Sequence, residues 1–231
     1  MDYVLEIRDL SKNYGATNAL NNVNLKIERG EIIGLLGPNG SGKTTLLKII
    51  NGLVNNYNGE VRILGQNLNV KSKGKVAFLP DSNFVPQSWS IARLLEFFGD
   101  FFDDFNKSRA LALFRELDIN LDLRFKSLSK GTKEKVQLCL ILSRDAEIYM
   151  FDEPIAGVDP KARDLIFRLI LDNYNKDASI IISTHLVRDV ESILSSAIFL
   201  RYGEVIAFDL IANLKAKYGN KNLEDIFKEL V

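Results

Sequence analysis

A glycine-rich stretch between an apolar run and a helix constrains this chain more than any other feature. It reads Gly37-Pro38-Asn39-Gly40-Ser41-Gly42-Lys43-Thr44-Thr45 and matches the pattern G-x-x-x-x-G-K-[ST]. The apolar residues at 31–36 predict a strand before it, and the spacing at 46–50 predicts a helix after it. Strand, glycine loop and helix in this order are the setting in which such a loop binds phosphate groups.

The residue types of this loop supply the chemistry of a nucleotide site. Gly37, Gly40 and Gly42 allow the backbone to turn so that its N–H groups face anionic oxygens. The N-terminus of the following helix adds the positive end of its dipole. We expect Lys43 to reach the β- and γ-phosphates and the Thr44 hydroxyl to hold Mg²⁺. We expect the whole loop, Gly37 to Thr45, to contact the nucleotide.

Composition narrows the class of protein. The chain has 231 residues, of which 46% are hydrophobic and 26% charged, as in ordinary soluble domains. Its 30 Lys and Arg balance its 30 Asp and Glu, so nothing indicates a nucleic-acid partner. There is no run of about 18 apolar residues and no secretion signal, so we expect a cytoplasmic protein unless a partner holds it at a surface. Cys139 stands alone in an apolar run and is expected to be a buried hydrophobe.

Periodicity predicts an α/β fold. Alternating residues at 3–9 and 23–28 predict half-exposed antiparallel strands, with Tyr14 in a loop between them. Further strands are predicted at 59–65, 75–79, 148–151, 180–182 and 197–200, and helices at about 161–175, 187–195 and 223–230. The last three of these strands are continuously apolar, as expected for strands covered on both faces. Their alternation with helices predicts a doubly wound, mostly parallel sheet.

Helical periodicity replaces the strand pattern between about 84 and 143. Ile91, Leu94, Leu95 and Phe98 follow the spacing of one helix face. The aromatic residues here are Trp89, Phe97, Phe98, Phe101, Phe102 and Phe105. They either fill the core of a small helical lobe or line a groove for a partner helix. We therefore expect one domain over 1–231, in which a core of 1–83 and 144–231 carries a helical subdomain at about 84–143.

Two acidic residues end the apolar strand at 148–151. We expect Asp152 to hold Mg²⁺ through water, and Glu153 to orient or deprotonate an attacking water. The alternative is a pair of surface acids that cap the next helix.

These motifs, taken with three other segments, resemble the ATP-binding cassette family. In family order after the glycine loop come Leu128-Ser129-Lys130-Gly131-Thr132, Asp152-Glu153-Pro154, Val158-Asp159-Pro160 and His185. The resemblance covers nearly the whole chain. It implies a P-loop NTPase fold with a mostly parallel core sheet, an antiparallel β subdomain and an inserted helical subdomain. It also implies an ATP-binding and ATP-hydrolysing transporter subunit, peripheral on the cytoplasmic face of the membrane, with permease subunits on separate chains.

The resemblance assigns roles to particular residues. Tyr14 resembles the aromatic residue that stacks on adenine, Glu153 the catalytic carboxylate, and His185 the histidine that contacts the γ-phosphate. Ser129 and Gly131 resemble the signature residues that bind the γ-phosphate held by a facing subunit. Asp159 resembles the aspartate that links the two ATP sites. The implied partner is a second cassette subunit, either a copy of this chain or a different one, joined head to tail.

Two departures from the family pattern leave alternatives open. Lys130 and Thr132 replace the usual glycine and glutamine of the signature, and Lys130 either adds charge near the phosphate or points to solvent. Asp81 stands where the family usually has glutamine, and it either coordinates Mg²⁺ through water or caps the next segment. These variants and the chain's ending resemble exporter-type subunits. The rival interpretations are a soluble cassette ATPase outside transport and a nucleotide-binding protein that does not hydrolyse.

Overall fold

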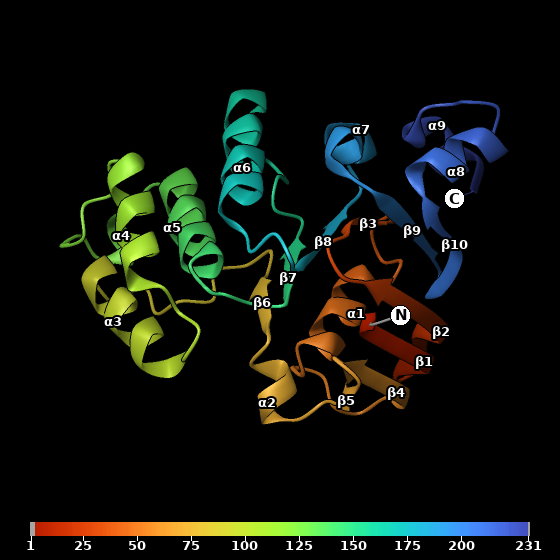
Figure 1. The fold of residues 1–231 in the computed structure, drawn as a ribbon, viewed down its shortest axis with the longest axis horizontal. Helices are drawn as coiled ribbons and strands as arrows, with labels where there is room; N and C mark the ends of the chain where they lie inside the picture. Colours follow the sequence, from red (N-terminus) through yellow and green to blue (C-terminus); the bar gives the residue numbers. More distant parts are fainter. Residues whose placement is uncertain (1–2, 231) are drawn as a thin grey trace.

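The computed structural model describes residues 3–230, which form two sheets with helices around them (Figure 1). The central sheet has the order β10-β9-β3-β8-β7-β6. Its strands are β3 (Ile32–Leu36), β6 (Val76–Leu79), β7 (Ile148–Asp152), β8 (Ser179–Thr184), β9 (Ser196–Arg201) and β10 (Glu204–Leu210). All neighbours pair in parallel except β10, which runs antiparallel to β9. The mostly parallel core sheet is thus confirmed.

The second sheet is antiparallel and has the order β2-β1-β4-β5. Its strands are β1 (Tyr3–Tyr14), β2 (Thr17–Glu28), β4 (Asn58–Ile63) and β5 (Gln66–Asn67). The prediction that Tyr14 lies in a loop was wrong: β1 reaches Tyr14, which pairs with Thr17 across a turn of Gly15 and Ala16. The hairpin tip is exposed, so its residues lack the apolar alternation that reveals a strand.

The helices occupy most of the predicted ranges. They are α1 (Lys43–Ile50), α2 (Val70–Lys73), α3 (Ile91–Phe101), α4 (Lys107–Glu116), α5 (Lys130–Leu142), α6 (Pro160–Asn173), α7 (Val187–Val190), α8 (Ile211–Lys217) and α9 (Leu223–Leu230). The helix predicted over 187–195 is shorter, because α7 gives way to a 3₁₀ turn at Glu191–Ile193. The short helices α2 and α8 were not predicted. No helix within residues 3–230 has the length and apolar character needed to cross a bilayer.

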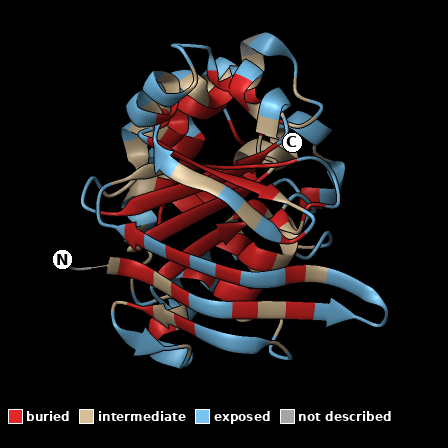
Figure 2. Ribbon diagram, turned by 90° about the vertical axis from the view of Figure 1, so that its right-hand side faces the viewer, coloured by how far each residue is buried: buried red, intermediate tan, exposed pale blue. Residues whose placement is uncertain are grey.

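The core lies on both faces of the central sheet, whose strands are almost wholly buried except for the edge strand β10 (Figure 2). Ile33, Met150 and Ile181 face α1 and the antiparallel sheet. The alternate residues Phe151 and Ile182 pack with the helices on the other face. Burial on both faces explains why these strands read as continuous apolar runs.

The residues between 84 and 143 form α3, α4, α5 and a 3₁₀ turn, set to one side of the sheet in Figure 1. Phe98 is buried, and Phe102 and Phe105 pack against the core. Phe97 and Phe101 lie on the surface, where Phe101 is 65% exposed and their rings stack 5.6 Å apart. The aromatic residues therefore divide between core and surface. Cys139 is fully buried, and burial raises the pKa of its thiol to about 12, so it is a small core residue.

Candidate nucleotide-binding site

The carboxyl ends of β3, β8, β7 and β6 bring the candidate residues to one edge of the sheet. Leu36 pairs with Thr184, Asp152 with Ser183, and Leu79 with Phe151. The glycine loop, the Ser183-Thr184-His185 segment, the acidic pair and Asp81 therefore follow neighbouring strands. In open α/β sheets this edge is where ligands bind.

The glycine loop has the backbone that its sequence predicts. Gly40 and Gly42 have φ angles of 81° and 109°, a region that side chains disfavour. Gly37 is needed for a different reason, because a Cβ atom there would lie 2.3 Å from the carbonyl oxygen of Leu200. α1 begins at Lys43 with no side-chain cap, which leaves N–H groups of its first turn free for an anion.

The other loop residues differ in exposure. Pro38 and Asn39 are exposed, and Thr45 is half-buried on α1. The Ser41 hydroxyl is buried and has no hydrogen-bond partner among the described residues.

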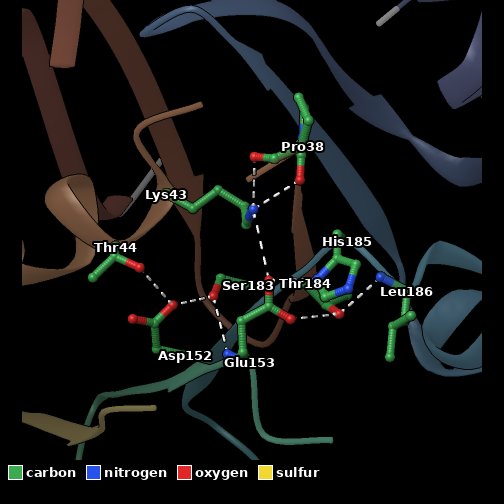
Figure 3. Close-up of polar contacts among 10 residues, drawn as sticks. Pro38, Lys43, Thr44, Asp152, Glu153, Ser183, Thr184, His185 and Leu186 are labelled. Carbon is green, nitrogen blue, oxygen red and sulfur yellow. Dashed lines mark hydrogen bonds and ion pairs between the residues drawn. The ribbon is translucent and has the colours of Figure 1, made fainter. Parts of the chain in front are cut away.

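The Lys43 ammonium is buried within the loop (Figure 3). Nζ donates hydrogen bonds to the carbonyl oxygens of Gly37 at 2.7 Å and Pro38 at 3.1 Å, and lies 3.7 Å from Oε1 of Glu153. Burial lowers the pKa of Lys43, and the carboxylates of Glu153 and Asp152 oppose that shift. The loop thus holds a buried positive charge beside the Glu153 carboxylate.

Asp152 ends β7 and is 1% exposed. Its Oδ1 accepts hydrogen bonds from the Thr44 hydroxyl at 3.2 Å and the Ser183 hydroxyl at 2.5 Å. Its Oδ2 is buried without a partner among the described residues. Burial raises the pKa of Asp152, the bonds from Ser183 and Thr44 lower it, and the charges of Asp81 and Glu153 raise it further.

This arrangement fits a hard cation such as Mg²⁺. A hydroxyl and a carboxylate with one unpartnered oxygen are adjacent, and both are ligands that Mg²⁺ prefers. The described residues contain no group of three or more His, Cys, Asp or Glu placed to hold a metal. Phosphate oxygens and water would therefore have to complete the coordination, as is usual for Mg²⁺ at nucleotide sites.

Glu153 lies directly beyond Asp152 in a strained backbone conformation with φ of 49°. Its N–H donates to the carbonyl of Ser183 at 3.0 Å, which holds this conformation. Its carboxylate accepts from the Thr184 hydroxyl at 3.1 Å and lies 3.0 Å from Nδ1 of His185. The helix-capping alternative for the acidic pair was wrong, because the next helix, α6, is capped by the side chain of Asp159.

The same edge opens into a cleft of about 630 Å³, whose lining includes Asn39, Asp81, Lys130, Asp152, Glu153 and His185. Asp81 is exposed there and makes no hydrogen bond with residues 3–230. The next α-helix, α3, is capped by Ser90, so the alternative that Asp81 is a cap has no support. The cleft thus joins the acidic edge to the start of α5.

The remaining predicted residues, other than Lys130, are absent from the lining of this cleft. Ser129 caps α5, accepting the Thr132 N–H at 3.2 Å. Gly131 and Asp159 line a neighbouring cleft of about 180 Å³. Tyr14 lies near the tip of the β1–β2 hairpin. Lys130 is exposed, and its Nζ lies 3.8 Å from Glu134 on its own helix.

Sequence reasoning missed three polar residues around the site. Ser183 and Thr184 orient Asp152 and Glu153, and their place at the end of a buried strand, next to His185, could have indicated this. Gln137 is buried on α5, where it accepts the N–H of Phe84 and donates to Asn83. It ties the segment that follows β6 to α5, and nothing in the sequence indicated that contact.

Comparison with known proteins decides the family. A family model described as ABC transporter matches residues 20–156, more than half of the chain. This chain belongs to the ABC transporter family.

Individual relatives of this ABC protein are distant in sequence but close in fold. The Nod factor export ATP-binding protein I of Cupriavidus pinatubonensis is 28% identical over 88% of the chain, which spans 65% of that protein's length. The lantibiotic transport ATP-binding protein SrtF of Streptococcus pyogenes is 28% identical, with 99% of this chain and 97% of that protein covered. A solved ATP-binding subunit of an ABC transporter superposes with a TM-score of 0.88 at 28% identity, covering 98% of this chain and 99% of that one. The fold is therefore that of an ABC ATPase, and the protein is the ATP-binding subunit of an ABC transporter.

Proposed function

We propose that this subunit binds and hydrolyses ATP to drive export through a permease carried on separate membrane chains. The observation that carries the proposal is the convergence of Lys43, Asp152 and Glu153 at one sheet edge, with Nζ of Lys43 3.7 Å from the Glu153 carboxylate. The names of the two relatives, for Nod factor export and lantibiotic transport, support the exporter assignment.

In this proposal the loop N–H groups and Lys43 bind the phosphates and hold them in line for attack. Thr44 and Asp152 would hold Mg²⁺, which neutralises charge on the phosphates when it is bound. Glu153 orients the attacking water and accepts its proton. His185 contacts that carboxylate through Nδ1, and in this proposal it also contacts the γ-phosphate.

The site is completed by a second cassette subunit, and we take this to be a second copy of the chain. Each copy carries both the glycine loop and the Ser129-Lys130-Gly131 segment, so a head-to-tail pair makes two complete sites. The first-turn N–H groups of α5 and the Ser129 hydroxyl offer donors to a phosphate held by the facing copy. Asp159, which is exposed, then links the two sites, and Lys130 adds positive charge.

The helical subdomain, at about 84–143, contacts the permease in this proposal and places the protein at the cytoplasmic face of the membrane. The exposed rings of Phe97 and Phe101 on α3 support this, since aromatic residues are enriched at protein interfaces. The protein is expected to co-purify with a multi-span membrane protein from its source organism. Co-purification with ribosomes or DNA would instead favour an ABC ATPase outside transport.

The metal assignment predicts that Thr44→Val loses the ability of Mg²⁺ to strengthen ATP binding. Valine keeps the branched shape but removes the hydroxyl that bonds Asp152. We expect affinity for ATP in Mg²⁺ to fall by about tenfold, the loss of one well-placed ligand contact. Titration calorimetry in EDTA provides the control, because the variant and the native protein should then bind ATP equally. A variant whose ATP binding Mg²⁺ still strengthened in full would contradict the role of Thr44.

The hydrolytic activity itself is tested by measuring phosphate release from ATP by the native protein.

A further inference from the structure

Lys12 is a buried cation that no part of the proposed chemistry uses. Its side chain is only 7% exposed, and Nζ donates a hydrogen bond of 2.5 Å to the carbonyl oxygen of Asn56. No Asp or Glu among residues 3–230 forms an ion pair with it. Burying an ammonium group without a counter-ion is costly, so the contacts that this lysine does make require an explanation.

The second contact of Lys12 is the ring of Tyr14. Nζ lies 4.6 Å from the ring centroid, within the range of a cation–π interaction. The pairing of β1 with β2 is irregular between Lys12 and Asn13, so it is this contact that shows the side chains of Lys12 and Tyr14 on one side of the sheet. Tyr14 is still 48% exposed, so the ammonium leaves part of the ring open to a ligand.

The side of the sheet that carries Lys12 and Tyr14 is the side next to the phosphate loop. Lys12 pairs across the hairpin with Leu20, so these two side chains lie on the same side. A methyl group of Leu20 comes within 3.0 Å of where a Cβ of Gly42 would stand. Asn56, the other partner of Lys12, follows α1 a few residues after its end. A nucleotide whose phosphates bind at Gly42 would therefore lie beside the hairpin that carries the Tyr14 ring.

We propose that Lys12 is a positioning residue for the nucleotide base. The Asn56 carbonyl fixes the ammonium, the ammonium fixes the Tyr14 ring, and the open face of the ring stacks on the purine of ATP. Because the ring is held before the ligand arrives, less side-chain freedom is lost on binding. This inference rests on the proposed function, in which ATP binds, and on the role that the family resemblance gives to Tyr14, stacking on adenine. Lys12 is a second residue that serves that stacking.

The test compares ATP with inorganic tripolyphosphate, both with Mg²⁺, by titration calorimetry on the full chain. Lys12→Met keeps the chain length and removes the charge, and we expect it to weaken ATP binding by about three- to tenfold. Tripolyphosphate has no base, so its affinity should stay within about twofold, which also shows that the variant is folded. Lys12→Arg keeps a cation beside the ring and should retain most of the affinity for ATP.

A double variant separates positioning from a general effect. In the Tyr14→Ala background, Lys12→Met should lower the affinity for ATP little further, because the ring that the lysine holds is gone. Two results would overturn the inference. One is that Lys12→Met weakens the binding of ATP and of tripolyphosphate equally, and the other is that it weakens ATP binding in the Tyr14→Ala background as much as it does in the native protein. If Lys12→Met does not fold, Lys12→Gln, which keeps a donor for Asn56, takes its place with the same expected results.

Failure of the adenine site itself would look different. In that case the native protein would bind ATP no better than tripolyphosphate, and Tyr14→Ala would change neither affinity. A Tyr14→Ala loss without any Lys12→Met loss would overturn the role of Lys12 alone.

Discussion

Replacing Lys43 with alanine is expected to abolish ATP binding, lowering the affinity by at least about 100-fold. The Lys43 ammonium is the positive side chain held inside the glycine loop, where it bonds the carbonyls of Gly37 and Pro38. Without it, the ammonium that offsets the carboxylates of Asp152 and Glu153 within the loop is gone when the phosphates arrive. Titration calorimetry with ATP and Mg²⁺ measures the loss directly.

Lys48→Ala is the matched control for this experiment. Lys48 lies in the last turn of α1, so the change removes one positive charge from the same helix but outside the loop. We expect its affinity for ATP to stay within about twofold of the native value, since single surface charges contribute little. Tight binding of ATP by Lys43→Ala would show that the glycine loop is not the phosphate site.

Replacing Glu153 with glutamine is expected to separate binding from hydrolysis. Glutamine has nearly the same shape and can still accept the hydrogen bond from Thr184, but it cannot take a proton from water. We expect ATP to bind with an affinity close to the native one, while phosphate release falls by about 1000-fold. Single-turnover phosphate release and titration calorimetry on the same preparation check both parts.

The control for this change lies at the opposite end of β7. Glu147 precedes β7 and pairs with Arg29 at 2.6 Å, away from the candidate site. Glu147→Gln should therefore hydrolyse ATP at the native rate. Normal turnover in Glu153→Gln would mean that another group accepts the proton.

The parts of the fold that depend on burial and on local backbone rules were predictable from the sequence. Central strands such as β7 and β8 are covered on both faces, so their apolar runs mark them plainly. The glycine loop was predictable because its positive φ angles demand glycine at Gly40 and Gly42. The position of Asp152 and Glu153 in the candidate site was predictable because they stand at the end of such a strand.

Features set by contacts between distant segments could not be predicted. The exposed tip of the β1–β2 hairpin is held by backbone pairing, which leaves no periodic signal at Tyr14. The contact of Lys12 with Asn56 joins residues 44 positions apart in the chain. Gln137 reaches Asn83 across 54 positions, and neither partner belongs to a motif. Side-chain bonds of this kind depend on the final packing, which periodicity and local propensity do not encode.

In the proposed dimer, one copy's glycine loop and another copy's Ser129-Lys130-Gly131 segment hold the same triphosphate. The most direct test measures the mass of Glu153→Gln in solution by light scattering, with and without ATP and Mg²⁺. We expect a monomer of 26.1 kDa without nucleotide and twice that mass with it. Adding Ser129→Asp, which still caps α5 but repels phosphate, should prevent the doubling while ATP remains bound. Two results would overturn this arrangement: Glu153→Gln alone staying a monomer when saturated with ATP, or a dimer that forms regardless of nucleotide and of Ser129→Asp.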